Sequence, residues 1–157
     1  MIGKIVQGAD FRGVVNYVLQ KPDAEPLGGR GLRNDSIDHI VDSFRTQASL
    51  NPIAKPVAHI SLDFSVQDKE RLTNKMMMQI ADEYLRRMGY GNTQVLIVRH
   101  NDREHPHLHL VLNRIDGNGK RISDRNERVR NAKVCRELSD KYGLYIAPSK
   151  ENVKRHR

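Results

Sequence analysis

The chain contains no tryptophan, a single cysteine and no long apolar run. One cysteine excludes an intramolecular disulfide and fits a reducing compartment, so we expect a cytoplasmic protein. No stretch approaches the roughly 20 apolar residues that span a bilayer, and the N-terminus lacks a signal-peptide pattern, so no membrane insertion is expected. Because only 5% of the residues are aromatic, few rings are present for stacking on nucleobases.

What the chain does have is positive charge. Its 157 residues carry a formal net charge of +8, and most of the excess lies in the last quarter, beyond Asp116. Such a balance indicates a polyanionic partner, with nucleic acid the leading candidate and backbone contacts supplying much of the affinity. The length and a hydrophobic content of 38% predict one domain over residues 1–157.

Four of the seven histidines lie between positions 100 and 109. In a strand, His105, His107 and His109 would share one face, while Leu108 and Leu110 would point to the other. Three neutral imidazoles can bind a divalent metal ion and leave its full charge to attract an anion such as phosphate. The alternation therefore predicts a metal site above an apolar core.

A histidine pair at this spacing is common by chance, so the prediction depends on His100 as well. His100 ends the apolar run 95–98, and a short loop can fold the chain back and place it beside the pair. We expect His100, His107 and His109 to be the metal ligands, with His105 a fourth neighbour or a phosphate contact. These nitrogen ligands do not distinguish Mg, Mn, Zn and Ni.

Hydrophobic periodicity predicts strands at residues 2–6, 57–65, 93–100 and 105–115. It predicts helices at residues 10–19, 35–48, from 65 or 67 to 89, and 126–142. Prolines and glycines between residues 21 and 33 indicate a loop. The expected fold class is α+β, an antiparallel sheet of about five strands with helices packed on one face. The open face would carry His59, Ser61, Asp63 and the histidines.

A metal site that binds phosphate suggests phosphoryl transfer, for which the attacking group is either metal-bound water or a side chain. Tyr17 lies off the apolar stripe that Phe11, Val15 and Val18 form on the first predicted helix, so it can reach a site; the alternative is an ordinary surface tyrosine. Tyr142 falls four residues after Leu138 on an apolar helix face, where it should pack.

Three segments together resemble a known family: residues 11–17 with Tyr17, the strand around His59 and Ser61, and residues 100–114. The chain resembles the N-terminal domain of mobilisation relaxases of the MobP type. These are HUH endonucleases, named for histidine-hydrophobic-histidine, here His107 to His109. The resemblance covers nearly the whole chain and implies the fold of that superfamily.

The resemblance implies a metal-dependent relaxase that nicks one DNA strand at an origin of transfer for conjugative mobilisation. Tyr17 would attack the scissile phosphodiester, stay joined to the 5′ phosphate and release a 3′ hydroxyl. Ser61 would lie near the DNA, and Asn113 would be a positioning residue. The implied partners are single-stranded DNA or an origin-of-transfer hairpin, together with accessory mobilisation or coupling proteins.

Other residues have expected supporting roles. Asp63, Asp102 and His105 are the available proton acceptors or outer-shell partners of the metal ligands. Phosphate contacts are expected from basic residues at Arg114, Arg121, Arg125, Arg128 and Arg130.

Three alternatives remain open from the sequence. One is a metal-dependent hydrolase that uses bound water. Another is a nuclease like the replication initiators, whose tyrosine follows the HUH element and would be Tyr142. The third is a non-catalytic basic DNA-binding module. Because relatives often carry a longer C-terminal region, a catalytic fragment of a longer protein is also consistent with the sequence. The DNA target sequence and the oligomeric state stay open.

Overall fold

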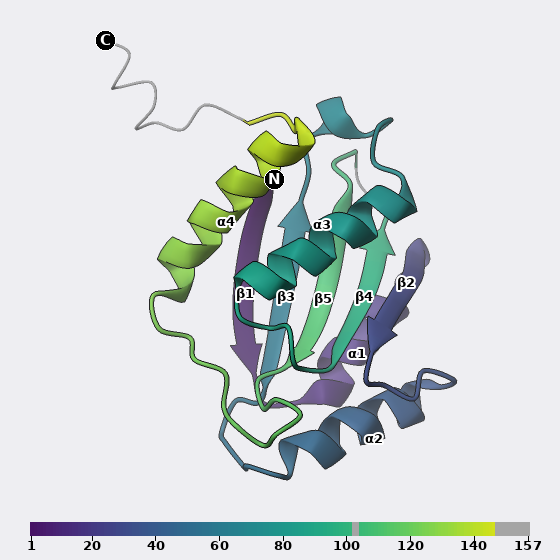
Figure 1. Cartoon of the computed structure of the whole chain (residues 1–157). Coiled ribbons are helices and arrows are strands. Elements are labelled where there is room, and N and C mark those ends of the chain that lie inside the picture. Colours follow the sequence, from purple (N-terminus) through teal and green to yellow (C-terminus); the bar gives the residue numbers. More distant parts are fainter. Residues whose placement is uncertain (102–103, 147–157) are drawn as a thin grey trace.

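A computed structural model describes residues 1–101 and 104–146 of the chain (Figure 1). Its five strands are β1 (Ile2–Gly8), β2 (Ala24–Arg30), β3 (Val57–Asp63), β4 (Val95–His100) and β5 (His107–Asn113). Its helices are α1 (Phe11–Leu19), α2 (Ile37–Ala48), α3 (Asn74–Arg87) and α4 (Glu127–Tyr142), with a 3-10 turn at Val66–Asp68. The predicted α+β class with about five strands is confirmed.

The strands form one sheet in the order β1-β3-β5-β4-β2, and each neighbouring pair is antiparallel. The central strand, β5, has two different faces. Leu108, Leu110 and Leu112 join one apolar cluster. His107, His109 and Val111 alternate with them and point to the opposite side. The predicted alternation of imidazole and leucine is therefore confirmed within β5.

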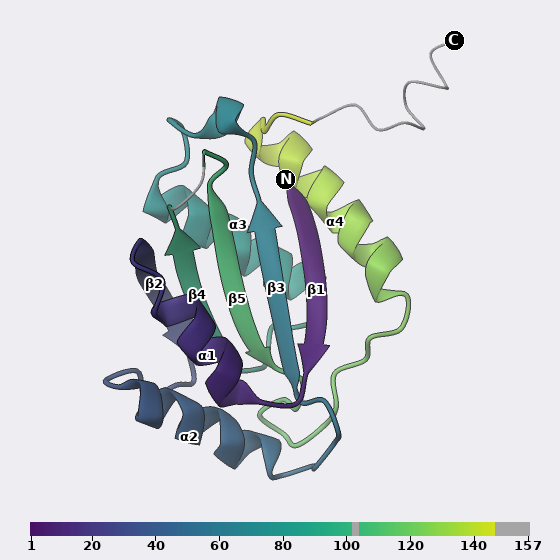
Figure 2. The same ribbon diagram turned by 180° about the vertical axis from the view of Figure 1, so that it is seen from behind.

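The expectation that all helices cover one face was wrong. Figure 1 shows α3 and α4 in front of the sheet, and Figure 2 shows α1 and α2 on the other side. Two separate apolar clusters lie under these helix pairs. The physical reason is visible in β4, where four consecutive apolar residues, 95–98, are all buried. Such a run is typical of a strand covered on both faces.

The segment predicted as a loop at residues 21–33 contains β2. This strand is at the sheet edge and pairs only with β4, with a register irregularity between Pro26 and Gly28. Edge strands tolerate proline, because the side of the strand that faces away from the sheet needs no hydrogen-bond donor. Proline and glycine were therefore misleading signals here.

Capping residues fix where the helices begin. The Asp10 side chain accepts hydrogen bonds from the backbone N–H groups of Arg12 and Gly13, which starts α1 as expected. The predicted helix from residue 65 to 89 was too long at its start. Ser65 caps only a 3-10 turn, and Thr73 caps α3 by accepting from the Met76 N–H. No helix in the described part of the chain combines the length and apolar character that crossing a membrane requires.

We expect Leu110→Ala to lower the free energy of unfolding by about 2–5 kcal/mol, because it opens a cavity in the fully buried cluster beneath α3. Leu50→Ala, at a leucine that is 62% exposed, should change it by less than about 1 kcal/mol. Urea denaturation of both variants measures the difference. Equal losses would contradict the assigned core.

Candidate metal and nucleophile site

The three predicted metal ligands meet at one end of the β4–β5 pair. His100 lies opposite His107 in the strand register, and His109 follows two residues along β5 on the same face. All three are buried, with exposures of 1%, 5% and 5% in chain order. One ring nitrogen from each lies within 4.8 Å of the others. The hairpin predicted from the sequence therefore does bring His100 to the pair.

This arrangement fits a divalent metal ion. Ligand nitrogens about 2.1 Å from an ion lie roughly 3–3.5 Å from one another in a tetrahedral site. The Nε2 atom of His109 is 3.1 Å from Nδ1 of His107, which already falls in that range. The remaining nitrogen, from His100, lies within 4.8 Å of the other two. Three neutral imidazoles also leave coordination positions for oxygen ligands.

His100 connects this cluster to α1. Its Nε2 atom lies 2.8 Å from the carbonyl oxygen of Val18, which is one of the last carbonyls of the helix and lacks an intrahelical partner. A carbonyl only accepts, so Nε2 carries the proton and donates it, and the imidazole lone pair is on Nδ1. The partial negative charge at the C-terminal end of α1 also favours a cation nearby.

Tyr17, the residue before Val18, lies beside the histidines. Its ring centroid is 6.1 Å from that of His109 and 6.1 Å from that of His59. The side chain is nonetheless 49% exposed, so a ligand can approach the hydroxyl. Lys21, just beyond α1, places its ammonium nitrogen 5.1 Å from the centre of the Tyr17 ring. Nothing in the sequence pattern singled out Lys21, because it lies in a segment predicted to be a loop.

Strand β3 pairs with β5 and places further polar side chains beside the histidines. Ser61 is opposite His109 and Asp63 is opposite His107 in the strand register. Nε2 of His59 lies 2.8 Å from Nδ1 of His109. Burial lowers the pKa of His59, and the nearby His100 lowers it further. Sequence reasoning placed His59 on this face but gave it no role; the signal available was its alternation with Ser61 and Asp63.

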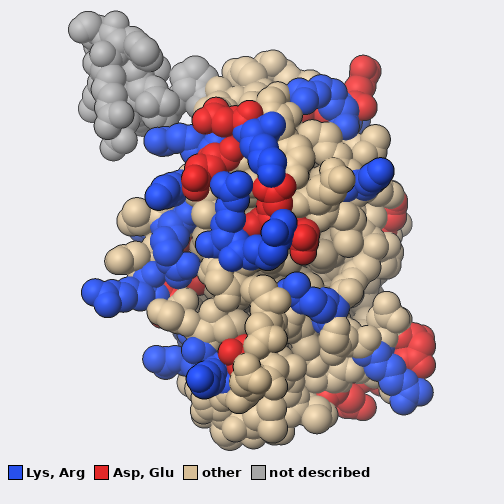
Figure 3. Space-filling view, viewed as in Figure 1, with Lys and Arg blue, Asp and Glu red and all other residues tan. Residues whose placement is uncertain are grey.

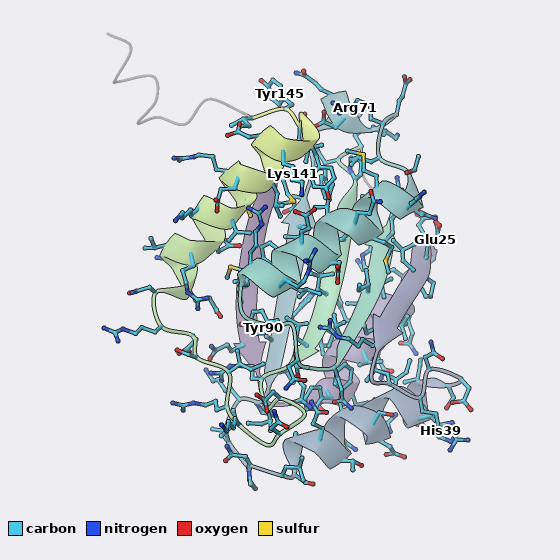
Figure 4. All side chains as sticks on the ribbon, in the orientation of Figure 1. Glu25, His39, Arg71, Tyr90, Lys141 and Tyr145 are labelled. Carbon is cyan, nitrogen blue, oxygen red and sulfur yellow. The ribbon has the colours of Figure 1, made fainter. Side chains whose placement is uncertain are left out.

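His105 is not brought into the ligand cluster. The strand begins at His107, so the alternation of faces does not extend to His105, which is exposed. It lines a cavity of about 350 Å³ together with Asp63 and Tyr145. Tyr145 is labelled in Figure 4, beyond the end of α4. Asp102, another predicted proton acceptor, lies outside the described residues.

Asn113 has clear structural partners. Its side-chain N–H₂ donates to the carbonyl of Phe44 and to Gln94 Oε1, and its Oδ1 accepts from the Ile115 N–H. It is fully buried at the end of β5 remote from His107. These contacts attach α2 to the sheet, and a positioning role of Asn113 in the reaction stays a prediction.

The five predicted phosphate-contacting arginines are not grouped around the histidines. The side chain of Arg114 is 8% exposed, donates to the Lys55 carbonyl and pairs with Asp124. The guanidinium of Arg130 donates to three backbone carbonyls. Exposed side chains are found at Arg121, Arg125 and Arg128. Their contact with DNA stays a prediction.

The alternative nucleophile, Tyr142, belongs to α4, which packs on the sheet face opposite the histidines. Its hydroxyl donates a 2.7 Å hydrogen bond to Glu83, which also pairs with Lys141. Lys141 is labelled in Figure 4. The bond to Glu83 raises the pKa of Tyr142. On the same helix, burial raises the pKa of Cys135 to about 11.

The fold and site together define a class: an antiparallel α+β domain with a buried HUH histidine cluster and a tyrosine from the first helix beside it. Comparison of the sequence with protein families agrees. The model of the relaxase family, described as MobA/VirD2-like, nuclease domain, matches residues 17–144. The chain belongs to this relaxase family, whose members are DNA-nicking enzymes of conjugation, as the resemblance predicted. No curated protein sequence matches it significantly.

Solved structures with the same fold are distant in sequence. One is the conjugative relaxase TrwC in complex with oriT DNA, in a metal-bound form; it is 12% identical with a TM-score of 0.53, covering 96% of this chain and 74% of that one. Another comes from a study of vancomycin resistance transfer in Staphylococcus aureus. It is 12% identical with a TM-score of 0.54, covering 93% of this chain and 96% of that one. At such identities the likeness concerns the fold alone.

We expect Asn113→Ala to lower the free energy of unfolding by about 2–4 kcal/mol, because it removes three buried hydrogen bonds. The exposed Asn118 provides a matched control, and Asn118→Ala should change stability by less than about 1 kcal/mol. Chemical denaturation gives both values. A fully stable Asn113→Ala protein would show that these bonds do not hold α2.

Proposed function

We propose that this relaxase domain nicks one DNA strand at an origin of transfer through Tyr17, with a divalent ion held by His100, His107 and His109. The observation that carries the proposal is the position of Tyr17, 6.1 Å between ring centroids from the ligand candidate His109, with its side chain half exposed. A nucleophile and a phosphate-binding ion must meet at the same phosphodiester, and these residues are adjacent.

In the proposed reaction the hydroxyl oxygen of Tyr17 attacks phosphorus. A bond forms between the phenolic oxygen of Tyr17 and phosphorus, and the bond from phosphorus to the 3′ oxygen breaks. The phenol loses its proton, and the 3′ oxygen gains one. The product is a 5′-phosphotyrosyl adduct with a free 3′ hydroxyl. Because the ester retains much of the energy of the bond that was broken, the ends can be rejoined, which hydrolysis would not allow.

The histidine cluster would hold the ion beside the attacked phosphate. A bound divalent ion would withdraw charge from the phosphate oxygens and stabilise the charge that develops in the transition state. The metal-bound form of TrwC with oriT DNA supports both the ion and the DNA substrate. Three imidazole nitrogens do not distinguish among Mg, Mn, Zn and Ni, so the proposal specifies only a divalent metal ion.

The surrounding residues would orient the DNA and accept a proton. Asp63 lies beside His107 in the register and is the proton acceptor we favour among the described residues. Lys21, close to the Tyr17 ring, would attract the phosphate next to the nucleophile. Ser61 lies on the same face of the sheet, opposite His109 in the register, where it would contact a DNA strand that passes the ion.

The net charge of +8 supports DNA as the partner. Figure 3 shows that lysines and arginines over α3 and α4 are intermixed with acidic side chains. Several of them form ion pairs, including Arg86 with Asp82 and Lys141 with Glu83. Because α3 and α4 cover the sheet face opposite the histidines, any DNA phosphate that these basic residues contact would lie outside the site.

We expect Tyr17→Phe to reduce formation of the covalent adduct by at least about 1,000-fold, because the phenyl ring has no oxygen to attack phosphorus. Tyr142→Phe should leave it within about threefold of the wild type. The assay is denaturing electrophoresis of a labelled single-stranded oligonucleotide that carries the cognate nick site. Cleavage without an adduct would support the water-dependent hydrolase, and binding alone would support the non-catalytic module.

We expect His107→Ala to reduce nicking by at least about 100-fold and DNA affinity by less than about 10-fold, because phosphate affinity comes largely from basic residues. Removing divalent ions with a chelator should have the same effect on the wild type. Nicking rates and fluorescence anisotropy with the same oligonucleotide separate these quantities. If both fell equally, the cluster would have a structural role alone.

A further inference from the structure

His59 occupies the space between the proposed nucleophile and one proposed metal ligand. Its ring is half-buried on β3, with the centroid 5.0 Å from that of His109 at an interplanar angle of 30°. The centroid is also 6.1 Å from that of Tyr17. It is outside the group of three nitrogens that can share an ion, so it is a neighbour of the site and not one of its ligand candidates.

With an ion on Nε2 of His109, the contact between His59 and His109 would specify the protons on both rings. His109 turns Nε2 toward His107, at 3.1 Å from its Nδ1, so Nε2 is the atom that faces the cluster. A neutral imidazole that gives the lone pair of Nε2 to an ion carries its proton on Nδ1. That Nδ1–H group points at Nε2 of His59, 2.8 Å away, and donates to it. His59 then carries its own proton on Nδ1.

This arrangement decides what His59 does. Its single lone pair accepts the hydrogen bond from His109, so it is engaged and can neither bind the ion nor take the proton of Tyr17. We propose that His59 is a positioning residue for the relaxase reaction: it fixes the ring orientation and proton position of His109 for metal binding. The inference rests on the metal centre of the proposed function.

The same logic already applies to His100, whose ring is oriented by the carbonyl of Val18. Among the described residues, His100 thus has an outer partner from the backbone of α1 and His109 has one from a side chain of β3. Hydrogen-bonded outer partners of this kind fix the ring orientation and raise the basicity of metal-ligating histidines. Their loss typically costs about 10–100-fold in metal affinity.

Two substitutions separate the hydrogen bond from the ring. His59→Phe keeps an aromatic ring against Tyr17 and removes the acceptor, whereas His59→Gln keeps an acceptor oxygen and removes the ring. His39→Phe is the matched control, because His39 is partly exposed on α2 and bonds Asp35. Isothermal titration with Mn²⁺ alone, without DNA, gives the affinity of each protein, and thermal melting confirms that each is folded.

We expect His59→Phe to weaken Mn²⁺ binding by about 10–100-fold, with His59→Gln and His39→Phe remaining within about fivefold of the wild type. The visible spectrum of the Co²⁺-loaded protein should change in His59→Phe and stay close to the wild type in His59→Gln. If His59→Phe does not fold, His59→Gln is compared with His59→Ala, which has no acceptor. Equal departures of the two variants from the wild type, in Mn²⁺ affinity and in the Co²⁺ spectrum, would overturn the proposal.

Unchanged Mn²⁺ affinity and an unchanged Co²⁺ spectrum in folded His59→Phe would overturn the role of His59 and leave the proposed nicking reaction intact. A wild-type protein that binds neither ion would overturn the metal centre itself, and the role of His59 with it. Because the titration contains no DNA, a failure of Tyr17 to form an adduct would not affect its result.

Discussion

The last carbonyls of α1 have no partner within the helix, and the one at Val18 is satisfied by the imidazole of His100. This single hydrogen bond connects the two halves of the site. On one side it orients a metal-ligand candidate at the end of β4. On the other it holds the turn of helix that carries Tyr17, one residue away. The bond also fixes the proton of His100 on Nε2, so its lone pair is on Nδ1. Geometry and protonation are thus set by the same contact.

The sheet provides the rigidity that this contact requires. β4 is covered on both faces by apolar clusters, so its end at His100 has little freedom to move. β5 lies at the centre of the sheet between β3 and β4, and its buried leucines fix the opposite face on which His107 and His109 stand. Sites built on strands hold their side chains more accurately than sites built on loops.

Much of the site could be predicted because strand periodicity is a local property. The alternation of His107 and His109 with leucines, and the apolar run before His100, require only the two-residue repeat and a short hairpin. Tyr17 was found because it is off the apolar stripe of its helix. In contrast, the contacts of Val18 and His59 depend on which strands and helices become neighbours, and no repeat encodes that. Asn113 and Arg114 show the same limit, since their partners come from α2 and from residues near Lys55.

The fold was predictable in class but not in layering. The proline and glycines of β2 led to the prediction of a loop, although an edge strand tolerates both residue types. The four consecutive apolar residues of β4 indicate a strand covered on both faces, and the prediction did not use this signal.

The central claim is that the hydroxyl of Tyr17 and the three imidazoles face a common ion. The most direct measurement is a crystal structure of the protein with Zn²⁺, with anomalous scattering recorded at the zinc edge. The account predicts one strong peak about 2.1 Å from one nitrogen of each histidine, with the Tyr17 hydroxyl across a gap wide enough for a phosphate. A peak elsewhere, or Tyr17 turned away from the ion, would contradict it.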